Sequence, residues 1–206
     1  MIVGIDVGGT NARALLVDPA TGGVLGRRRS SSAGDGPALV RCIAGMVEEL
    51  RVEETVEAVG LGIAGLADRA GTLCYSPNLP DLLGFPIGPE LEDAIGVPVT
   101  VGNDATTATL GEARLGAGRG SDHFGLVTLG TGIGTGFVLD GRLVEGAHGF
   151  AGEAGHMVVD ANGPAHITGH RGPWEYFASG SALGRMGRMA AGEGRFQQLE
   201  RWRLVG

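Results

Sequence analysis

The chain has 206 residues, room for one large domain or two small ones, and its 43% hydrophobic and 19% charged residues favour a packed core over disorder. A net charge of −7 argues against a nucleic-acid partner, because neutralising phosphates requires a basic surface. The cysteines Cys42 and Cys74 fit free thiols in a reducing compartment. With no leader-like start and no apolar run near the ~18 residues of a membrane span, we expect a cytoplasmic protein without a membrane partner.

The first feature is an apolar run, residues 2–7, followed by a glycine turn. The pattern predicts a buried strand that presents Asp6 at its carboxyl end, and a turn in which Gly8 and Gly9 take positive φ. Residues 12–18 indicate a second strand. Exposed N–H groups in such a turn form a concave site for phosphate oxygens, so we interpret it as a phosphate loop, with a ligand-free hairpin turn as the alternative.

The next elements outline a sheet with helices on its faces. Residues 24–29 predict a third strand, and residues 38–52 carry apolar side chains at helical spacing. Residues 56–65 form a nearly continuous apolar run, typical of a strand covered on both faces. Together they predict a mixed α/β sheet.

Two polar positions follow at the ends of predicted elements. Asn78 lies between two prolines that stiffen its loop, and its carboxamide suits a sugar hydroxyl or a simple turn. Residues 95–102 predict a strand and residues 105–115 a helix, which places Asp104 at the junction where α/β sheets bind ligands. An ionised carboxylate there can accept a proton from an attacking hydroxyl, and a plain helix N-cap is the alternative.

The opening pattern returns in the second half of the chain. After a glycine-rich joint at residues 116–121, residues 124–129 predict a strand, a glycine–threonine turn spans residues 130–136, and residues 137–144 predict a hairpin. Two such turns, one in each half, can face each other across a cleft and hold a polyphosphate chain; a coincidental pair is the alternative.

A polar cluster follows the second turn. Glu153 and His156 are spaced i, i+3 among small residues that leave room for a ligand, with a packing role for the histidine as the alternative. Residues 163–172 form a loop that holds His166 and His170, and residues 181–191 predict a helix.

The order of these pieces resembles the ROK family of repressors, open reading frames and kinases, and within it the bacterial glucokinases. The matching stretches are Asp6-Val7-Gly8-Gly9-Thr10, Ser76-Pro77-Asn78-Leu79-Pro80, Gly102-Asn103-Asp104, Leu129-Gly130-Thr131-Gly132-Ile133-Gly134-Thr135-Gly136, Gly152-Glu153-Ala154-Gly155-His156, Trp174-Glu175 and Ala178-Ser179-Gly180. The resemblance implies the actin-like, ribonuclease-H-like two-domain fold, with a sugar-kinase lobe at residues 1–116 and a partial second lobe at residues 117–206.

The resemblance also implies roles for single residues in a hexose kinase. Asp104 is the expected general base on the 6-hydroxyl of glucose, and Asp6 the expected Mg²⁺ ligand, through water. The implied sugar ligands are Asn78, Asn103, Asp104, Glu153, His156 and Glu175. The implied contacts to the phosphates of ATP, or of polyphosphate as donor, are Asp6, Gly8, Gly9, Thr10, Gly130, Thr131 and Gly132. Homodimers are common among such kinases.

The chain departs from the family pattern at a structural zinc site. Many members bind zinc through the family histidine and three cysteines, and here the cysteine positions hold His166, Thr168 and Pro173. Proline has no ligating side chain and threonine is a poor zinc ligand, so we expect no structural zinc. A site built from His156, His166 and His170 is the alternative.

The second departure is length. The family continues past the helix at residues 181–191 with helices, a strand, an adenosine-contacting turn and a closing helix. Here a polar, basic tail begins at Gln197 and leaves Trp202 stranded, so we expect a truncated chain with most of the nucleotide-base site missing. A non-catalytic sugar-binding remnant is therefore an alternative to the kinase. A DNA-binding regulator is disfavoured because the first strand starts at Ile2.

Overall fold

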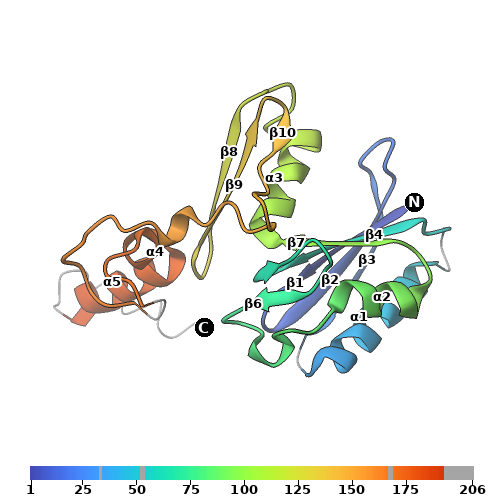
Figure 1. The fold of residues 1–206 in the computed structure, drawn as a ribbon, viewed down its shortest axis with the longest axis horizontal. Coiled ribbons are helices and arrows are strands. Elements are labelled where there is room, and N and C mark those ends of the chain that lie inside the picture. Colours follow the sequence, from blue (N-terminus) through green and yellow to red (C-terminus); the bar gives the residue numbers. More distant parts are fainter. Residues whose placement is uncertain (33, 52–53, 167–168, 193–206) are drawn as a thin grey trace. The chain divides into compact units, whose positions relative to one another are not determined.

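The computed structural model describes residues 1–32, 34–51, 54–166 and 169–192 (Figure 1). The interpretations of Thr168 and of the tail from Gln197 concern residues outside this part.

A five-stranded mixed sheet is the centre of the N-terminal part, with strand order β3-β2-β1-β4-β7. Its strands are β1 (Ile2–Val7), β2 (Asn11–Val17), β3 (Val24–Ser31), β4 (Ala58–Ile63) and β7 (Val99–Asn103). β1 pairs antiparallel with β2 and parallel with β4, and β4 pairs parallel with β7. The predicted mixed sheet is confirmed, and its three parallel strands all end at the edge that carries Asp6, Ile63 and Asn103.

Two helices, α1 (Gly36–Arg51) and α2 (Ile87–Ile95), pack against each other beside this sheet (Figure 1). Their apolar stripes join the inward side chains of β1, β2 and β4 in one core. The helix predicted at residues 38–52 is confirmed, whereas α2 was not predicted and includes Ile95, which the sequence pattern had assigned to a strand.

The two faces of β4 are not alike, so the expectation of a strand covered throughout on both faces is wrong. Leu61 and Ile63 are buried in the core, while Gly60 is exposed. Gly62, on the same face as Gly60, lies against α3 (Asp104–Leu115). A methyl group at Gly62 would be 2.7 Å from the Thr107 hydroxyl. The bare glycine therefore allows α3 to approach the sheet closely.

Short elements complete the chain. They are β5 (Leu66–Ala67), β6 (Leu73–Tyr75), the 3₁₀ helix η1 (Pro80–Leu82), β8 (Phe124–Leu129), β9 (Ile133–Leu139), β10 (Arg142–Leu143), the 3₁₀ helix η2 (Ala154–His156), α4 (Trp174–Ala178) and α5 (Gly180–Gly192). The predicted hairpin after the second turn is confirmed. Its Asp140-Gly141 corner has both residues at positive φ, 50° and 69°, as a tight two-residue hairpin turn requires.

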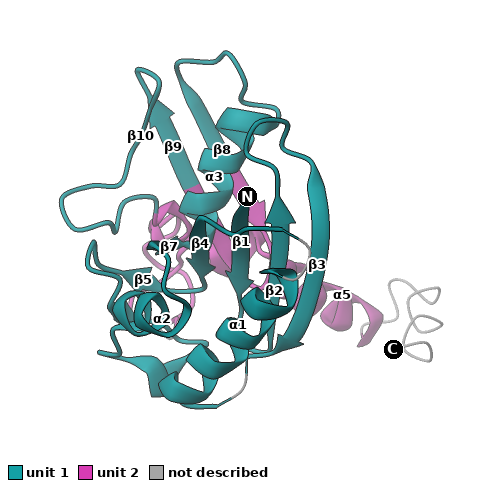
Figure 2. Cartoon of the chain, turned by 90° about the vertical axis from the view of Figure 1, so that its right-hand side faces the viewer, with its two compact units in different colours: residues 1–126, 136–152 teal, residues 127–135, 153–206 magenta. Residues whose placement is uncertain are grey.

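The chain divides into two compact units (Figure 2). Unit 1 comprises residues 1–126 and 136–152, and unit 2 comprises residues 127–135 and 153–206. The second glycine–threonine turn therefore belongs to unit 2, although β8 and β9, which flank it, extend into unit 1. The predicted lobes at residues 1–116 and 117–206 stay a prediction. In the described ranges, no helix has the length and apolar character of a membrane span.

We expect Gly62→Ala to destabilise the protein and Gly60→Ala to leave it unchanged or slightly more stable. The methyl group at residue 62 meets Thr107, whose hydroxyl donates to the carbonyls of Asn103 and Asp104, whereas nothing lies within 4 Å of a methyl group at residue 60. Overpacking costs about 1–3 kcal/mol, and relieving a strand glycine gains about 0.5–1 kcal/mol. Urea unfolding of the two variants measures the difference, and equal free energies of unfolding would contradict the close approach of α3.

Candidate active site

The carboxyl ends of the parallel strands bring the acidic residues of unit 1 together. Asp6 on β1 pairs with Gly62 on β4, which in turn pairs with Gly102 on β7. Both glycines lie under α3, because a methyl group at Gly62 or Gly102 would be 2.7 Å or 3.0 Å from side-chain atoms of Thr107. Asp104 follows one residue after β7 ends, and the negative charge of Asp6 is felt at its carboxyl group. The structure thus places Asp6 and Asp104 at one edge of the sheet.

Asn103, not Asp104, is the N-cap of α3. The Asn103 side-chain oxygen accepts hydrogen bonds from the N–H groups of Ala105 (3.0 Å) and Thr106 (3.1 Å). Its side-chain nitrogen donates to the Gly65 carbonyl at 3.1 Å. The alternative role of Asp104 as a plain cap is therefore filled by its neighbour. The oxygen of the Asn103 carboxamide is already engaged, and one N–H of that carboxamide remains for a ligand.

Asp104 is exposed, yet its surroundings disfavour its charged form. Partial desolvation raises the pKa of the carboxyl group above its ordinary value, and the nearby Asp6 charge raises it further. The hydrogen bond that Asp104 Oδ1 accepts from the Ala105 N–H, at 2.8 Å, lowers the pKa but does not outweigh desolvation. A carboxylate with a raised pKa is a better proton acceptor.

The first glycine turn is supported at both ends and open in the middle. The Gly8 N–H donates to the Asn11 carbonyl at 3.0 Å, and the Gly8 carbonyl accepts from the Ser32 hydroxyl at 2.6 Å. In the described part of the chain, no protein acceptor faces the N–H groups of Gly9 and Thr10. These two donors fit the predicted phosphate loop.

The positive φ predicted for the glycines in this turn is wrong. Neither Gly8 nor Gly9 has positive φ. Gly9 instead allows close approach, because a methyl group there would be 3.1 Å from the backbone oxygen of Asn78. The structure therefore brings the Asn78 loop against the first turn. That loop is pinned by buried Ser76, whose hydroxyl donates to the Ala64 carbonyl at 2.6 Å and accepts from the Leu79 N–H at 3.0 Å.

The second glycine turn, in unit 2, has different supports. The Gly130 N–H donates to the Gly132 carbonyl at 3.1 Å, and the Gly130 carbonyl accepts from Gly180 at the start of α5 at 2.8 Å. A methyl group at Gly132 would be 2.5 Å from Oε2 of Glu175. The exposed Thr131 lies between the two glycines. Beside this turn is a groove of about 440 Å³, which Arg188 of α5 also lines and which the sequence pattern did not indicate.

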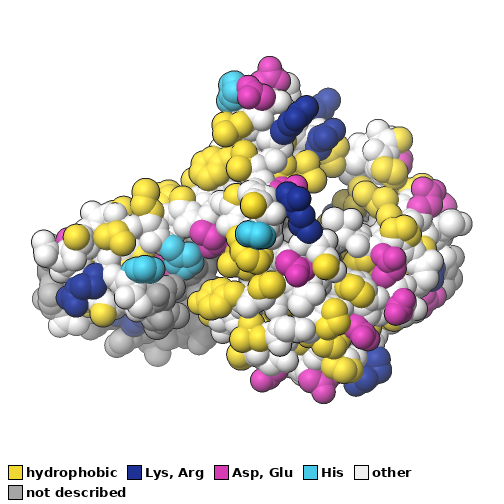
Figure 3. All heavy atoms as spheres, in the orientation of Figure 1, with side chains coloured by type: hydrophobic (Ala, Val, Ile, Leu, Met, Phe, Trp, Pro, Cys, Tyr) yellow, Lys and Arg dark blue, Asp and Glu magenta, His cyan; other side chains and the backbone are white. Residues whose placement is uncertain are grey.

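Unit 2 also assembles the predicted histidine and glutamates. His156 Nε2 lies 3.4 Å from Glu153 Oε2, and His156 Nδ1 lies 3.4 Å from Glu175 Oε1. Glu175 Oε2 accepts from the Ile133 N–H at 3.4 Å, next to the second turn. His166, which was predicted only as a loop residue or an alternative metal ligand, lies with Nε2 3.4 Å from Glu175 Oε1. Figure 3 shows histidine side chains at the surface near α4.

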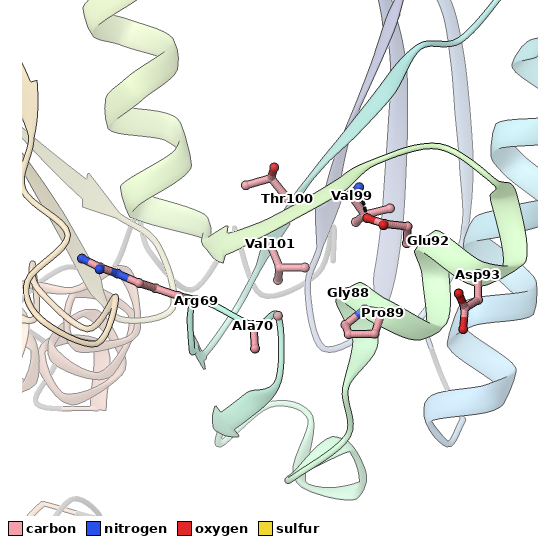
Figure 4. Close-up of a pocket in the computed structure, with 10 residues that line it drawn as sticks. Arg69, Ala70, Gly88, Pro89, Glu92, Asp93, Val99, Thr100 and Val101 are labelled. Carbon is pink, nitrogen blue, oxygen red and sulfur yellow. Dashed lines mark hydrogen bonds between the residues drawn. The ribbon is translucent and has the colours of Figure 1, made fainter.

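The predicted residues therefore form two sets, one in each unit. Unit 1 brings together Asp6, Gly8, Gly9, Thr10, Asn78, Asn103 and Asp104, and unit 2 brings together Gly130, Thr131, Gly132, Glu153, His156 and Glu175. A separate hollow of about 280 Å³ lies in unit 1 between the β7 edge and α2, and none of the predicted residues lines it (Figure 4). There the Glu92 carboxylate accepts from the Val99 N–H at 2.9 Å.

Comparison with known proteins identifies the class. The model of the ROK family matches residues 2–199, so the chain belongs to the ROK family. It is 40% identical over 187 residues to a glucokinase of Thermotoga maritima, covering 89% of this chain and 59% of that one. It is 36% identical over 192 residues to a glucokinase of Streptomyces coelicolor, covering 93% and 60%.

The fold comparison agrees. A ROK family glucokinase from Streptomyces griseus, in complex with glucose and AMPPNP, superposes with a TM-score of 0.83 at 37% identity, covering 93% of this chain and 61% of that one. The predicted actin-like, ribonuclease-H-like kinase fold is confirmed. The chain spans about three fifths of the length of these relatives.

The relatives also include proteins of other activities. The xylose repressor of Bacillus subtilis is 31% identical over 186 residues, covering 88% of this chain and 48% of its own. An inorganic polyphosphate/ATP-glucomannokinase from an Arthrobacter strain superposes with a TM-score of 0.73 at 34% identity, covering 90% of this chain and 71% of that one. The family therefore contains both kinases and regulators, and its kinases use nucleotide or polyphosphate as phosphoryl donor. Experiment must distinguish these for the present chain.

The raised pKa of Asp104 predicts a pH-dependent gain of stability on its replacement by asparagine. Below a pH of about 4 the carboxyl group is protonated in both folded and unfolded chains, and its burial costs nothing. As pH rises through the ordinary and then the raised pKa, ionisation in the folded state becomes unfavourable. We expect the unfolding midpoint of Asp104→Asn to exceed that of the parent at pH 7 and to match it near pH 3. A constant offset at all pH values would contradict the shift.

Proposed function

We propose that the chain belongs to a hexose kinase that transfers a phosphoryl group from ATP to the 6-hydroxyl of glucose, with Asp104 as general base. The observation that carries the proposal is the state of Asp104: exposed, not used as a helix cap, and with a raised pKa, at the sheet edge that also carries Asp6 and the first glycine turn. The glucokinase relatives support the same reaction.

In the proposed reaction, Asp104 accepts the proton of the 6-hydroxyl while that oxygen attacks the terminal phosphorus of the donor. The bond from this phosphorus to the bridging oxygen of ATP breaks, which leaves glucose 6-phosphate and ADP. The N–H groups of Gly9 and Thr10 suit donor phosphate oxygens, because they have no acceptor in the described part of the protein. Phosphoryl transfer depends mainly on such positioning and on charge neutralisation.

The sugar-binding role extends to both sets of polar residues. Asn78, Asn103 and Asp104 in unit 1 and Glu153, His156 and Glu175 in unit 2 are the proposed sugar ligands. Carboxylates and imidazoles accept and donate the hydrogen bonds that sugar hydroxyls need. Gly130, Thr131 and Gly132 are the proposed contacts to the donor on the second turn, beside the groove that Arg188 lines.

The carboxylate oxygens of unit 1 fit a magnesium ion. Asp6 is exposed, and in the described part of the chain its carboxylate has neither a hydrogen-bond nor an ion-pair partner, so both oxygens are available as hard ligands, directly or through water. A bound Mg²⁺ neutralises charge that develops on the transferred phosphoryl group. We propose Asp6 as the residue that holds it.

A sugar-binding protein without turnover is the second candidate, and the xylose repressor among the relatives favours it. A coupled assay for glucose 6-phosphate, run beside calorimetry with glucose, separates the two. Binding without turnover supports the second candidate. A panel of hexoses, each with ATP and with polyphosphate, then identifies the acceptor and the donor.

We expect Asp104→Asn to reduce kcat by about 10²- to 10⁴-fold, since the amide cannot accept the proton. The amide keeps the size and most hydrogen bonds of the carboxylate, so the glucose dissociation constant should change little. Asp93→Asn, an exposed carboxylate on α2 outside both sets, is the matched control. Retained turnover in Asp104→Asn would refute the role of Asp104 as base.

A further inference from the structure

One carboxylate in unit 2 lies between two imidazoles. Oε1 of Glu175 is 3.4 Å from His156 Nδ1 and 3.4 Å from His166 Nε2, while Oε2 accepts from the Ile133 N–H. The side chains of Glu175 and His166 are only 15% and 18% exposed. Among the described residues, buried His156 Nδ1 has no hydrogen-bond partner, and Glu175 Oε1 lies at ion-pair distance from it.

His166 is carried by a loop that backbone hydrogen bonds close. Its own N–H donates to the His170 carbonyl at 2.9 Å, and the Gly172 N–H donates to the Pro164 carbonyl at 2.9 Å. Further along, the Trp174 N–H donates to the Met157 carbonyl at 2.9 Å. These backbone bonds join the two sides of the loop, and the His166 imidazole lies beside Glu175 and Tyr176 of α4.

The zinc that other ROK members bind at these positions does not fit this chain. The cysteine positions hold His166, Thr168 and Pro173; Pro173 offers no donor, and Thr168 lies outside the described residues. In the part of the chain that the structure describes, no group of at least three His, Cys, Asp or Glu residues has a metal-binding arrangement. In this chain a residue other than a zinc ligand must therefore orient Glu175 and His156.

We infer that His166 is a positioning residue: its Nε2 holds Glu175 and, through Glu175, orients His156. The inference rests on the proposed function only in that Glu175 and His156 are taken as sugar ligands. Without His166, Oε1 of Glu175 has one imidazole neighbour in place of two, and the carboxylate gains freedom to rotate away from His156. Residues that orient metal-ligating histidines change metal affinity or activity by about 10- to 100-fold when they are lost, and we expect the lower end of that range for a sugar ligand.

The experiment compares two amides at position 166 in the full 206-residue chain. Glutamine places an N–H where histidine has Nε2, and asparagine places one where histidine has Nδ1. We expect His166→Asn to shift the His156 imidazole ¹⁵N resonances in the sugar-free protein and to weaken glucose binding by about 10-fold. His166→Gln should restore both values. His170→Ala is the matched control, because its exposed side chain makes no hydrogen bond or ion pair in the described structure.

The outcomes are distinct. Unchanged His156 resonances in His166→Asn, or equal effects of the two amides, would overturn the inference. Should the parent bind no glucose while the resonance shift and its rescue appear, the inference stands and the proposed function fails. Treatment with EDTA should leave glucose affinity unchanged, and a loss that added zinc reverses would contradict the metal-free arrangement.

Discussion

The arrangement of unit 1 depends on one side chain, the carboxamide of Asn103. Its oxygen caps α3 through two backbone N–H groups, and its nitrogen binds the Gly65 carbonyl, so one residue joins the end of β7, the start of α3 and the segment after β4. Because Asn103 supplies the cap, Asp104 occupies the first helical position and its carboxylate is not needed as the helix cap. Partial desolvation raises the pKa of that carboxyl group, and perturbed pKa values are typical of functional groups.

The two glycine–threonine turns share a sequence pattern but not a physical basis. The first is held by Ser32 and pressed against the Asn78 loop, and it contains no residue at positive φ. The second is held by Gly180 and by the Glu175 carboxylate, which leaves no room for a side chain at Gly132. In both turns glycine is required for the close approach of a neighbouring polar group. The residues that exclude a side chain from these turns, Asn78 through its backbone oxygen and Glu175 through its carboxylate, are also proposed sugar ligands. The proposed phosphate and sugar contacts are therefore neighbours within each unit.

The sequence predicted the strands that lead into these turns, because the apolar runs of β1 and β8 are typical of strands. The run in β1 also marks its buried side, whereas no residue of β8 is buried. The sequence did not predict α2. The first turn of this short helix contains Gly88 and Pro89, which are typical of a loop, although proline is tolerated in a first helical turn. The sequence could not show that Asn103 rather than Asp104 caps α3, since both residue types are good caps. The position of His166 against Glu175 was also hidden, because loop closure between residues nine apart depends on backbone hydrogen bonds that no periodicity encodes.

The two sets of acidic residues differ in how their charge is balanced, and this matches the proposed division of labour. Glu153 and Glu175 lie at ion-pair distance from imidazoles, an arrangement that suits an uncharged sugar. Asp6 and Asp104 have no ion-pair partner in the described part of the protein, and the charge of Asp6 raises the cost of ionising Asp104. Arg13 is the cross-strand neighbour of Asp6 on β2, so one basic side chain lies beside these carboxylates without an ion pair to either in the described part of the protein. A donor that brought further negative charge to the first glycine turn would meet two carboxylates and this one cation, and a divalent ion held by Asp6 would supply the remaining positive charge.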